Sequence, residues 1–241
     1  MLLPRGIMFS YYGSKSKVVS YYPKPKFDKI IEPFAGSARY SLQHFEKDIL
    51  LVDKYEIIVK IWHYLQAASK QDIMGLPDPK VGETIDRNNF ECIEQAWLVG
   101  FLIQSGVNAP RLTVTKNRKD GIAWQKKSIA DQLYKIKHWE IKQGDYKELE
   151  NEEATWFIDP PYQYGGEWYV KNNKDINFSS LAEWCKERKG QAIVCENTKA
   201  DWLPFKQMAK MTGTKYTTTE AIWSNLQTEY DWETIDMFAA T

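Results

Sequence analysis

Short apolar runs that end at turn residues recur along this chain and predict the strands of a buried sheet. Three of these runs are followed by a proline or an aspartate, and they lie at 28–32, 49–52 and 154–158. Further strands are expected at 139–142 and 191–196, and a closing pair of strands at 214–219 and 234–239. Apolar residues at helical spacing predict helices at about 37–45, 56–68, 90–103 and 180–187.

The alternation of strand and helix predicts an α/β fold, a mostly parallel central sheet with helices on both faces. Ser179 is the expected N-cap of the last helix. The alternation lapses between about 75 and 143. We therefore expect one domain formed by 1–74 and 138–241, interrupted by an inserted lobe, mainly helical or irregular, at 75–137.

Composition excludes several classes of protein. The 241 residues carry no net charge and are 43% hydrophobic, as in ordinary globular proteins. The start has no long apolar segment and no run of 18 apolar residues occurs, which predicts neither export nor membrane spanning. Three cysteines without a CxxC pair indicate the reducing cytoplasm, and neither they nor the three histidines have the spacing of a metal site.

The inserted lobe concentrates positive charge. The segment 108–142 carries nine basic and three acidic residues, together with Trp124 and Tyr134, in a chain that is neutral overall. Such a surface can contact phosphates, although a solvated helix face would have the same composition. The candidate nucleic-acid contacts are basic residues of this lobe: Arg111, Lys116, Arg118, Lys119, Lys126 and Lys127.

The motif Asp159-Pro160-Pro161-Tyr162 follows the predicted strand 154–158. Two prolines remove two backbone donors and stiffen the exit from the strand. The motif thus offers a carboxylate, a free carbonyl and an aromatic face where open α/β sheets bind ligands. A planar ring with an exocyclic amine would satisfy all three groups, whereas the simpler alternative is a Pro-Pro turn capped by an aspartate.

A second motif suggests a nucleotide site. The strand 28–32 leads into the small-residue turn Pro33-Phe34-Ala35-Gly36-Ser37, which opens a predicted helix. Asp53 ends the next strand, at the spacing of an acidic residue that accepts from ribose hydroxyls. Helix capping by Ser37 and Asp53 is the alternative.

Taken together, these motifs resemble the Dam-like DNA adenine-N6 methyltransferases. The match consists of Tyr12-Gly13-Ser14-Lys15, the turn at Gly36, Asp53, Gly144-Asp145-Tyr146, and the motif beginning at Asp159, in the family's order. The insertion falls where that family keeps its target-recognition lobe. The resemblance implies a Rossmann-like methyltransferase domain that uses S-adenosylmethionine and no metal, with double-stranded DNA as its partner.

The resemblance also assigns residues. The catalytic motif is Asp159, Pro160, Pro161 and Tyr162, in which Asp159 and the Pro160 carbonyl would hold the adenine amine and Tyr162 would stack on a flipped base. The cofactor would contact Tyr12, Gly13, Lys15, Pro33, Phe34, Ala35, Gly36, Ser37, Asp53, Asp145, Tyr146 and Asp159. Ala38 stands where the family often has a second glycine, which would disfavour a positive φ there.

Two alternatives stay open at this point. The acceptor of the methyl group could be RNA or single-stranded nucleic acid, because the net charge is zero and the basic lobe is modest. The chain could also be a non-catalytic nucleic-acid-binding relative, which Ala38 in the cofactor turn would favour.

Overall fold

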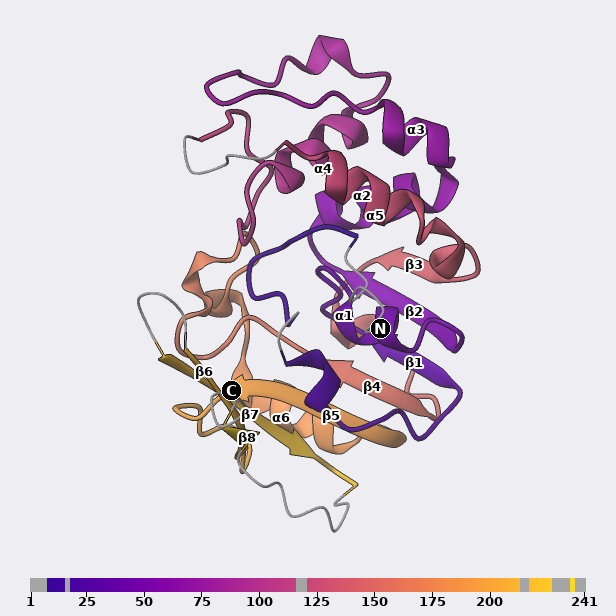
Figure 1. The fold of residues 1–241 in the computed structure, drawn as a ribbon. Coiled ribbons are helices and arrows are strands. Elements are labelled where there is room, and N and C mark those ends of the chain that lie inside the picture. The colour runs from indigo at the N-terminus through magenta and orange to yellow at the C-terminus, as the bar shows by residue number, and fades with distance from the viewer. Residues whose placement is uncertain (1–7, 16–17, 116–120, 213–216, 227–234, 237–241) are drawn as a thin grey trace.

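A computed structural model describes residues 8–15, 18–115, 121–212, 217–226 and 235–236 (Figure 1). Its sheet has eight strands in the order β3-β2-β1-β4-β5-β7-β6-β8. The strands are β1 Lys29–Glu32, β2 Asp48–Asp53, β3 Glu140–Gln143, β4 Ala154–Ile158, β5 Gly190–Asn197, β6 Lys206–Thr212, β7 Thr217–Ser224 and β8 Ile235–Asp236. The first five are mutually parallel, whereas β7 runs antiparallel to both β5 and β6.

Alternate side chains of the central strands enter two different cores, as the period of a strand requires. On one face Ile31, Trp156 and Val194 pack against α6 (Phe178–Lys186). On the other face Ile30, Phe157 and Ile193 join a larger cluster that includes α2 (Glu56–Ala67). Burial of both faces explains why these strands are almost continuously apolar, and the predicted α/β class is confirmed.

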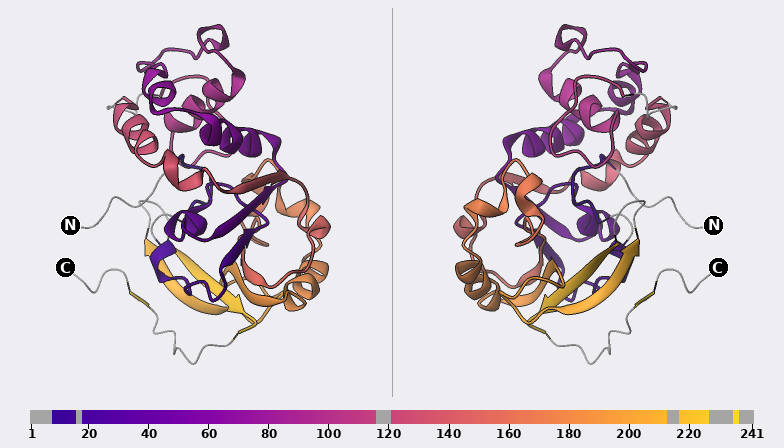
Figure 2. Two further views of the ribbon diagram at one scale, coloured as in Figure 1. Left: turned by 90° about the vertical axis from the view of Figure 1, so that its right-hand side faces the viewer. Right: turned by 90° about the vertical axis from the view of Figure 1, so that its left-hand side faces the viewer.

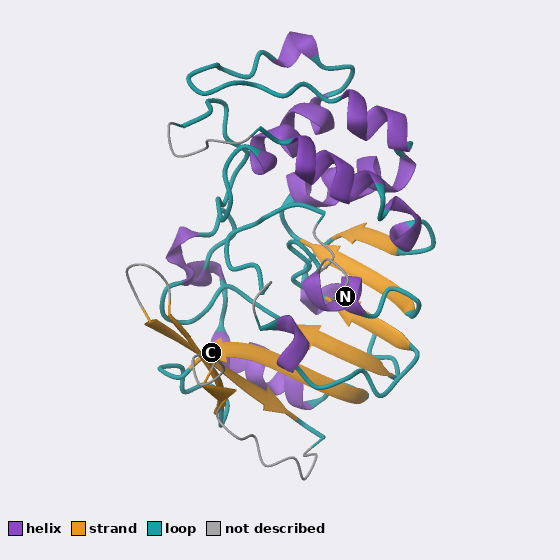
Figure 3. Cartoon of the chain, viewed as in Figure 1, coloured by secondary structure: helices purple, strands orange, loops and turns teal. Residues whose placement is uncertain are grey.

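The α-helices between α2 and β3 form a group at the β3 end of the molecule, opposite β6 and β7 (Figure 2; Figure 3). They are α3 (Lys70–Gly75), α4 (Ile93–Leu102) and α5 (Ala123–Ala130). Leu98 and Phe101 of α4 and Ile129 of α5 belong to the same buried cluster as α2. The lobe is therefore anchored to the sheet through α2 and not by its ends alone.

Some sequence expectations need correction. The helix expected at 37–45 is only Arg39–Gln43 (α1), because Ala38 before it is left-handed. The N-cap of α6 is Asn177, whose Oδ1 accepts from Ser180 N at 3.0 Å, and not Ser179. The closing pair is also wrong, since β7 pairs with β5 and with the unpredicted strand β6, while β8 lies parallel to β6. Residues 214–216, 234 and 237–239 of the expected pair lie outside the described residues.

Candidate active site

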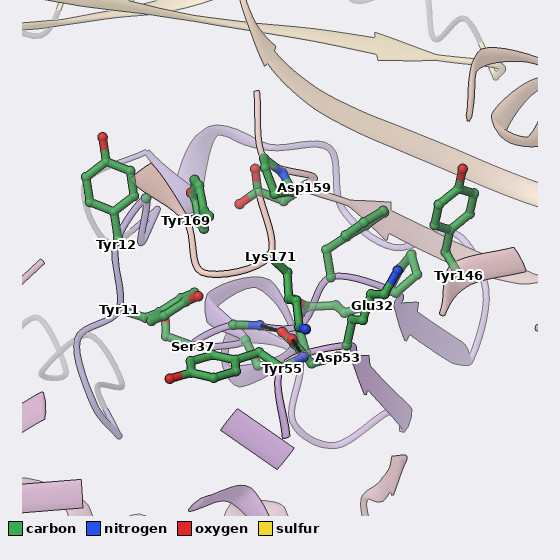
Figure 4. A pocket seen from close by; sticks show the side chains of 18 of the residues that line it. Tyr11, Tyr12, Glu32, Ser37, Asp53, Tyr55, Tyr146, Asp159, Tyr169 and Lys171 are labelled. Carbon is green, nitrogen blue, oxygen red and sulfur yellow. Dashed lines mark hydrogen bonds between the residues drawn. The ribbon is translucent and has the colours of Figure 1, made fainter. Parts of the chain in front are cut away.

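A cleft lies at the carboxyl ends of the parallel strands, where the chain order reverses between β1 and β4. The cleft, including the space at its open mouth, has a volume of about 1030 Å³, which is the size of a cofactor site. Its walls come from the ends of β1, β2, β3 and β4 and from two irregular segments, 11–15 and 169–176. Tyr11, Tyr12 and Tyr169 lie on one side of the cleft and Tyr146 on the other (Figure 4).

Asp53 is held rigidly at the floor of the cleft. Its Oδ2 accepts from Gly36 N at 2.9 Å and its Oδ1 from Tyr55 N at 2.8 Å. Burial raises the pKa of Asp53 to about 6, against the lowering effect of these hydrogen bonds. A carboxylate can accept about four hydrogen bonds, so each oxygen keeps capacity for one hydroxyl of a bound sugar.

The turn after β1 has two residues with positive φ. Gly36 has a φ of 46°, and a Cβ there would lie 3.1 Å from Tyr11 Cδ1. Ala38 has φ 44° and ψ 47°, although it is not glycine and is only 1% exposed. Ala38 therefore adopts the positive φ that an alanine disfavours. The turn keeps the backbone geometry of a glycine turn, and the cost is backbone strain at Ala38.

This strain gives an asymmetric prediction for substitutions at position 38. We expect Ala38→Gly to change the free energy of unfolding by less than about 1 kcal/mol, because relief of strain offsets the lost methyl burial and the added chain entropy. Ala38→Val should destabilise by about 2–4 kcal/mol, since a β-branched residue is strained there and overpacks the site. Urea unfolding of both variants checks this, and equal effects would contradict it.

The N-terminal segment forms the wall above this turn. Arg39 donates from Nε to Ser14 Oγ at 2.8 Å and from a terminal nitrogen to the carbonyl of Phe9 at 3.1 Å. Gly13 has a φ of 75°, and a Cβ on it would lie 1.8 Å from the Tyr169 hydroxyl. Glycine is thus required at position 13 by close packing against Tyr169. Sequence reasoning did not identify Tyr169 as a site residue.

Asp145 and Tyr146 lie at the rim, after β3. The Asp145 carboxylate accepts from Lys147 N at 3.1 Å and forms an ion pair with Lys54 at 3.0 Å. Burial raises the pKa of Asp145, but Lys147 N and the Lys54 ammonium outweigh burial and the pKa is lowered. Tyr146 packs against the ring of Phe34 with centroids 5.4 Å apart, so these two side chains form an apolar wall.

Asp159 follows β4 directly and lines the cleft. Its Oδ1 lies 2.9 Å from Lys15 Nζ, with Asp159 18% and Lys15 7% exposed. Burial raises the pKa of Asp159 to about 6, although the Lys15 ammonium lowers it. Among the described residues nothing donates to the second oxygen, which is therefore free to accept from a ligand.

The other members of the motif are placed differently. Pro161 lines the cleft, whereas Pro160 is buried and neither it nor Tyr162 belongs to the lining. The Tyr162 hydroxyl donates to Glu220 Oε1 at 2.6 Å, and Lys15 Nζ lies 4.4 Å from the centre of its ring. One face of Tyr162 is therefore covered by an ammonium, and only the opposite face could stack on a base.

Two buried acids of the site were missed by sequence reasoning. Glu220 of β7 is 3% exposed, and Glu32, at the end of β1, lines the cleft. Burial raises the pKa of Glu32 to about 8, although it accepts a hydrogen bond from Ser41 N. An acidic residue at the end of a strand with two isoleucines was the available signal for Glu32, whereas Glu220 lies in the middle of β7, after three threonines.

The basic residues predicted to contact phosphates do not form one group. Arg111 and Lys127 are exposed, although Lys127 pairs with Asp131 at 2.7 Å. Lys126 is a correction: it is buried, and its Nζ donates to the carbonyl of Leu76 at 2.6 Å, which closes the end of α3. Lys116, Arg118 and Lys119 lie outside the described residues.

Within the described ranges, no group of three or more His, Cys, Asp or Glu side chains is arranged to hold a metal ion. In the same part of the chain, no helix combines the length and apolarity needed to cross a membrane.

No protein-family model and no curated protein matches the sequence. Two of the solved structures similar to this chain are a putative methyltransferase, yhhF, from Escherichia coli (7% identity, 80% of this chain and 74% of that chain covered, TM-score 0.34) and the rRNA methyltransferase aviRa from Streptomyces viridochromogenes (10%, 87% and 81%, 0.42). At these TM-scores neither likeness supports an inference about this chain.

Proposed function

We propose that this protein transfers a methyl group from S-adenosylmethionine to the exocyclic N6 of adenine in duplex DNA, after the base has been flipped out of the helix. One observation carries the proposal. The Asp159 carboxylate opens onto the same cleft as the Gly36 turn and Asp53, so an amine acceptor and a nucleotide-like cofactor can be bound side by side.

The residues of the cleft fit this cofactor. Asp53 has two acceptor positions left for the ribose hydroxyls. Phe34 and Tyr146 offer an apolar wall for the adenine ring, and Asp145 borders it as a hydrogen-bond acceptor. When bound, S-adenosylmethionine supplies an electrophilic methyl group on its sulfonium.

The protein's own contribution is to bind and activate the amine. Adenine N6 is a weak nucleophile because its lone pair is delocalised into the ring. A carboxylate that accepts one of its N–H bonds returns electron density to the nitrogen and fixes its direction. Asp159 can do this through its free oxygen, which can also accept the proton that N6 loses on methylation, while Lys15 fixes the other oxygen.

A flipped base also needs a surface at the cleft. The segment after β4 has three exposed large apolar residues: Tyr164, Trp168 and Val170. The other exposed large apolar residues in the described part of the chain lie between 74 and 134. The carbonyl of Trp168 accepts from Asn108 Nδ2, which joins this segment to the lobe. Exposed aromatic rings beside a cleft suit contact with unstacked bases.

Trp168→Ala should therefore weaken DNA binding by about 1–3 kcal/mol, which is roughly 5- to 150-fold in Kd. Met74→Ala is the control, because Met74 is also an exposed large apolar residue, at 47%, but lies on α3, outside the basic segment 108–142. Fluorescence anisotropy with a labelled duplex measures both, and equal effects would count against this surface.

The activity itself is tested by transfer of tritium from labelled S-adenosylmethionine to duplexes with and without adenine. We expect label only in the adenine-containing duplex, recovered as N6-methyladenine after digestion. Adenine-containing RNA and single-stranded DNA are compared in parallel, and preferential labelling of either would change the proposed acceptor. Cofactor binding in calorimetry without label in any acceptor would refute the proposal.

A further inference from the structure

Glu220 connects the last part of the sheet to the proposed catalytic motif. It lies on β7, in register with Asn197 at the end of β5, and it is 3% exposed. Its Oε1 accepts from the hydroxyls of both Tyr22 and Tyr162, each at 2.6 Å. Two donors at a single oxygen are what an ionised carboxylate accommodates.

The same oxygen lies 3.7 Å from Lys15 Nζ. Lys15 therefore stands between two carboxylates, with Asp159 at 2.9 Å on the other side, and over the Tyr162 ring. Glu220 and the Tyr162 ring are held by hydrogen bonds of 2.6 Å, so the ammonium that contacts both has little freedom to move. The position of Lys15 in turn fixes Asp159.

A purely structural role explains this arrangement poorly. Two carboxylates around one ammonium leave a net negative charge in a buried cluster, and apolar residues of similar volume are usually as stable as a buried ion pair. The negative charge does match the proposed reaction, because both a sulfonium donor and an amine that gains a methyl group are positively charged.

We infer that Glu220 is a positioning residue for the proposed methyl transfer. It holds Lys15 and Tyr162 in place, and its negative charge counteracts the electrostatic effect of the Lys15 ammonium on the Asp159 carboxyl. This inference rests on the proposed function. It assigns to β7, a strand inside the sheet, a part in preparing the amine acceptor, although Glu220 lies 61 residues beyond Asp159 in the sequence.

The electrostatic consequence has a defined sign. The ionisable groups around Asp159 are Lys15, Tyr22, Glu32, Tyr162, Tyr169, Cys195, Glu196 and Glu220. Burial raises the pKa of Asp159 most, Lys15 lowers it and Glu220 raises it. Removal of the Glu220 charge should therefore let Asp159 ionise at a lower pH.

The test compares Glu220→Gln, Glu220→Met and Glu196→Gln. Glu196 is a buried carboxylate on the neighbouring strand β5 and serves as the matched control. We expect the acidic limb of kcat/KM to move down by on the order of one pH unit in both Glu220 variants and much less in the control. Glu220→Gln keeps an acceptor for both hydroxyls, so its kcat should stay well above that of Glu220→Met.

A second readout does not need turnover. The titration of the Asp159 carboxyl, followed by NMR in protein labelled with ¹³C at aspartate and assigned through Asp159→Asn, should have a lower midpoint in both Glu220 variants. An unchanged midpoint and an unchanged limb would overturn the inference. A wild-type protein without transfer activity would overturn the proposed function instead, and the two failures are distinguishable because the titration is read in the resting protein.

Discussion

Replacing Asp159 by alanine should abolish methyl transfer and leave the protein folded. The carboxylate is the only acidic group of the motif at 159–162, and its free oxygen is the proposed acceptor for the amine. Loss of a preorganised group of this kind lowers kcat by at least about 10²-fold. Single-turnover tritium transfer at saturating DNA measures the effect on the chemical step.

Stability should change far less than activity. Lys15 keeps Glu220 as a partner at 3.7 Å, and Asp159 borders the open cleft, so we expect a loss of about 1–2 kcal/mol in the free energy of unfolding. Asp201→Ala is the control, since this exposed carboxylate lies nearby and accepts from Gln163 Nε2 at 3.1 Å. Substantial residual transfer by a folded Asp159→Ala protein would refute the assigned role.

The second large effect is expected for Lys15→Met. Without the ammonium, Asp159 and Glu220 become neighbouring buried carboxylates that have lost the counter-charge of Lys15. Removing one partner of a buried ion pair costs about 3–5 kcal/mol, because the remaining charge is uncompensated. Lys54→Met is the matched control: the Lys54 side chain, paired with Asp145, is 52% exposed, so we expect a loss of no more than about 1 kcal/mol there.

The loss in Lys15→Met should depend on pH. The pKa of Asp159 is already about 6 in the folded protein, and loss of Lys15 raises it further. Between the pKa of an unfolded aspartate, about 3.9, and the raised pKa of Asp159, the folded variant then binds more protons than the unfolded chain. The stability of the variant therefore falls as pH rises through this range. Urea unfolding should show the full deficit at pH 8 and a smaller one near pH 5.

Wild-type Lys15 does not complicate this comparison. Its pKa is raised in the folded protein, because Asp159 and Glu220 outweigh the effect of burial. A lysine of this kind contributes its stabilisation fully at any pH below its unfolded pKa. A deficit that is the same at both pH values would contradict the assigned electrostatics.

The parts of the site that could be predicted from sequence are those carried by parallel strand ends. Asp53, Gly36 and Asp159 each follow a short apolar strand directly, and parallel neighbours bring such positions to one edge of the sheet. Local order along the chain was sufficient for this, and the cleft does bring these residues together.

The remaining parts depend on long-range packing. Glu220 reaches the site only because β7 inserts antiparallel between β5 and β6, a register that no local pattern specifies. A count of charges could not separate Lys126, which is buried against the end of α3, from exposed Lys127. At Ala38, the tertiary demands of the turn override the local preference against positive φ.

The contact of Glu220 with Tyr22 and Lys15 has a consequence for biosynthesis. Tyr22 meets a residue 198 positions later in the sequence, so the charge balance at Asp159 is not established until β7 has left the ribosome. A truncated product that ends before β7 would retain the cleft motifs and Lys15 but lack Glu220, the second carboxylate beside Lys15. We therefore expect such partial chains to lack the charge arrangement on which the proposed transfer depends.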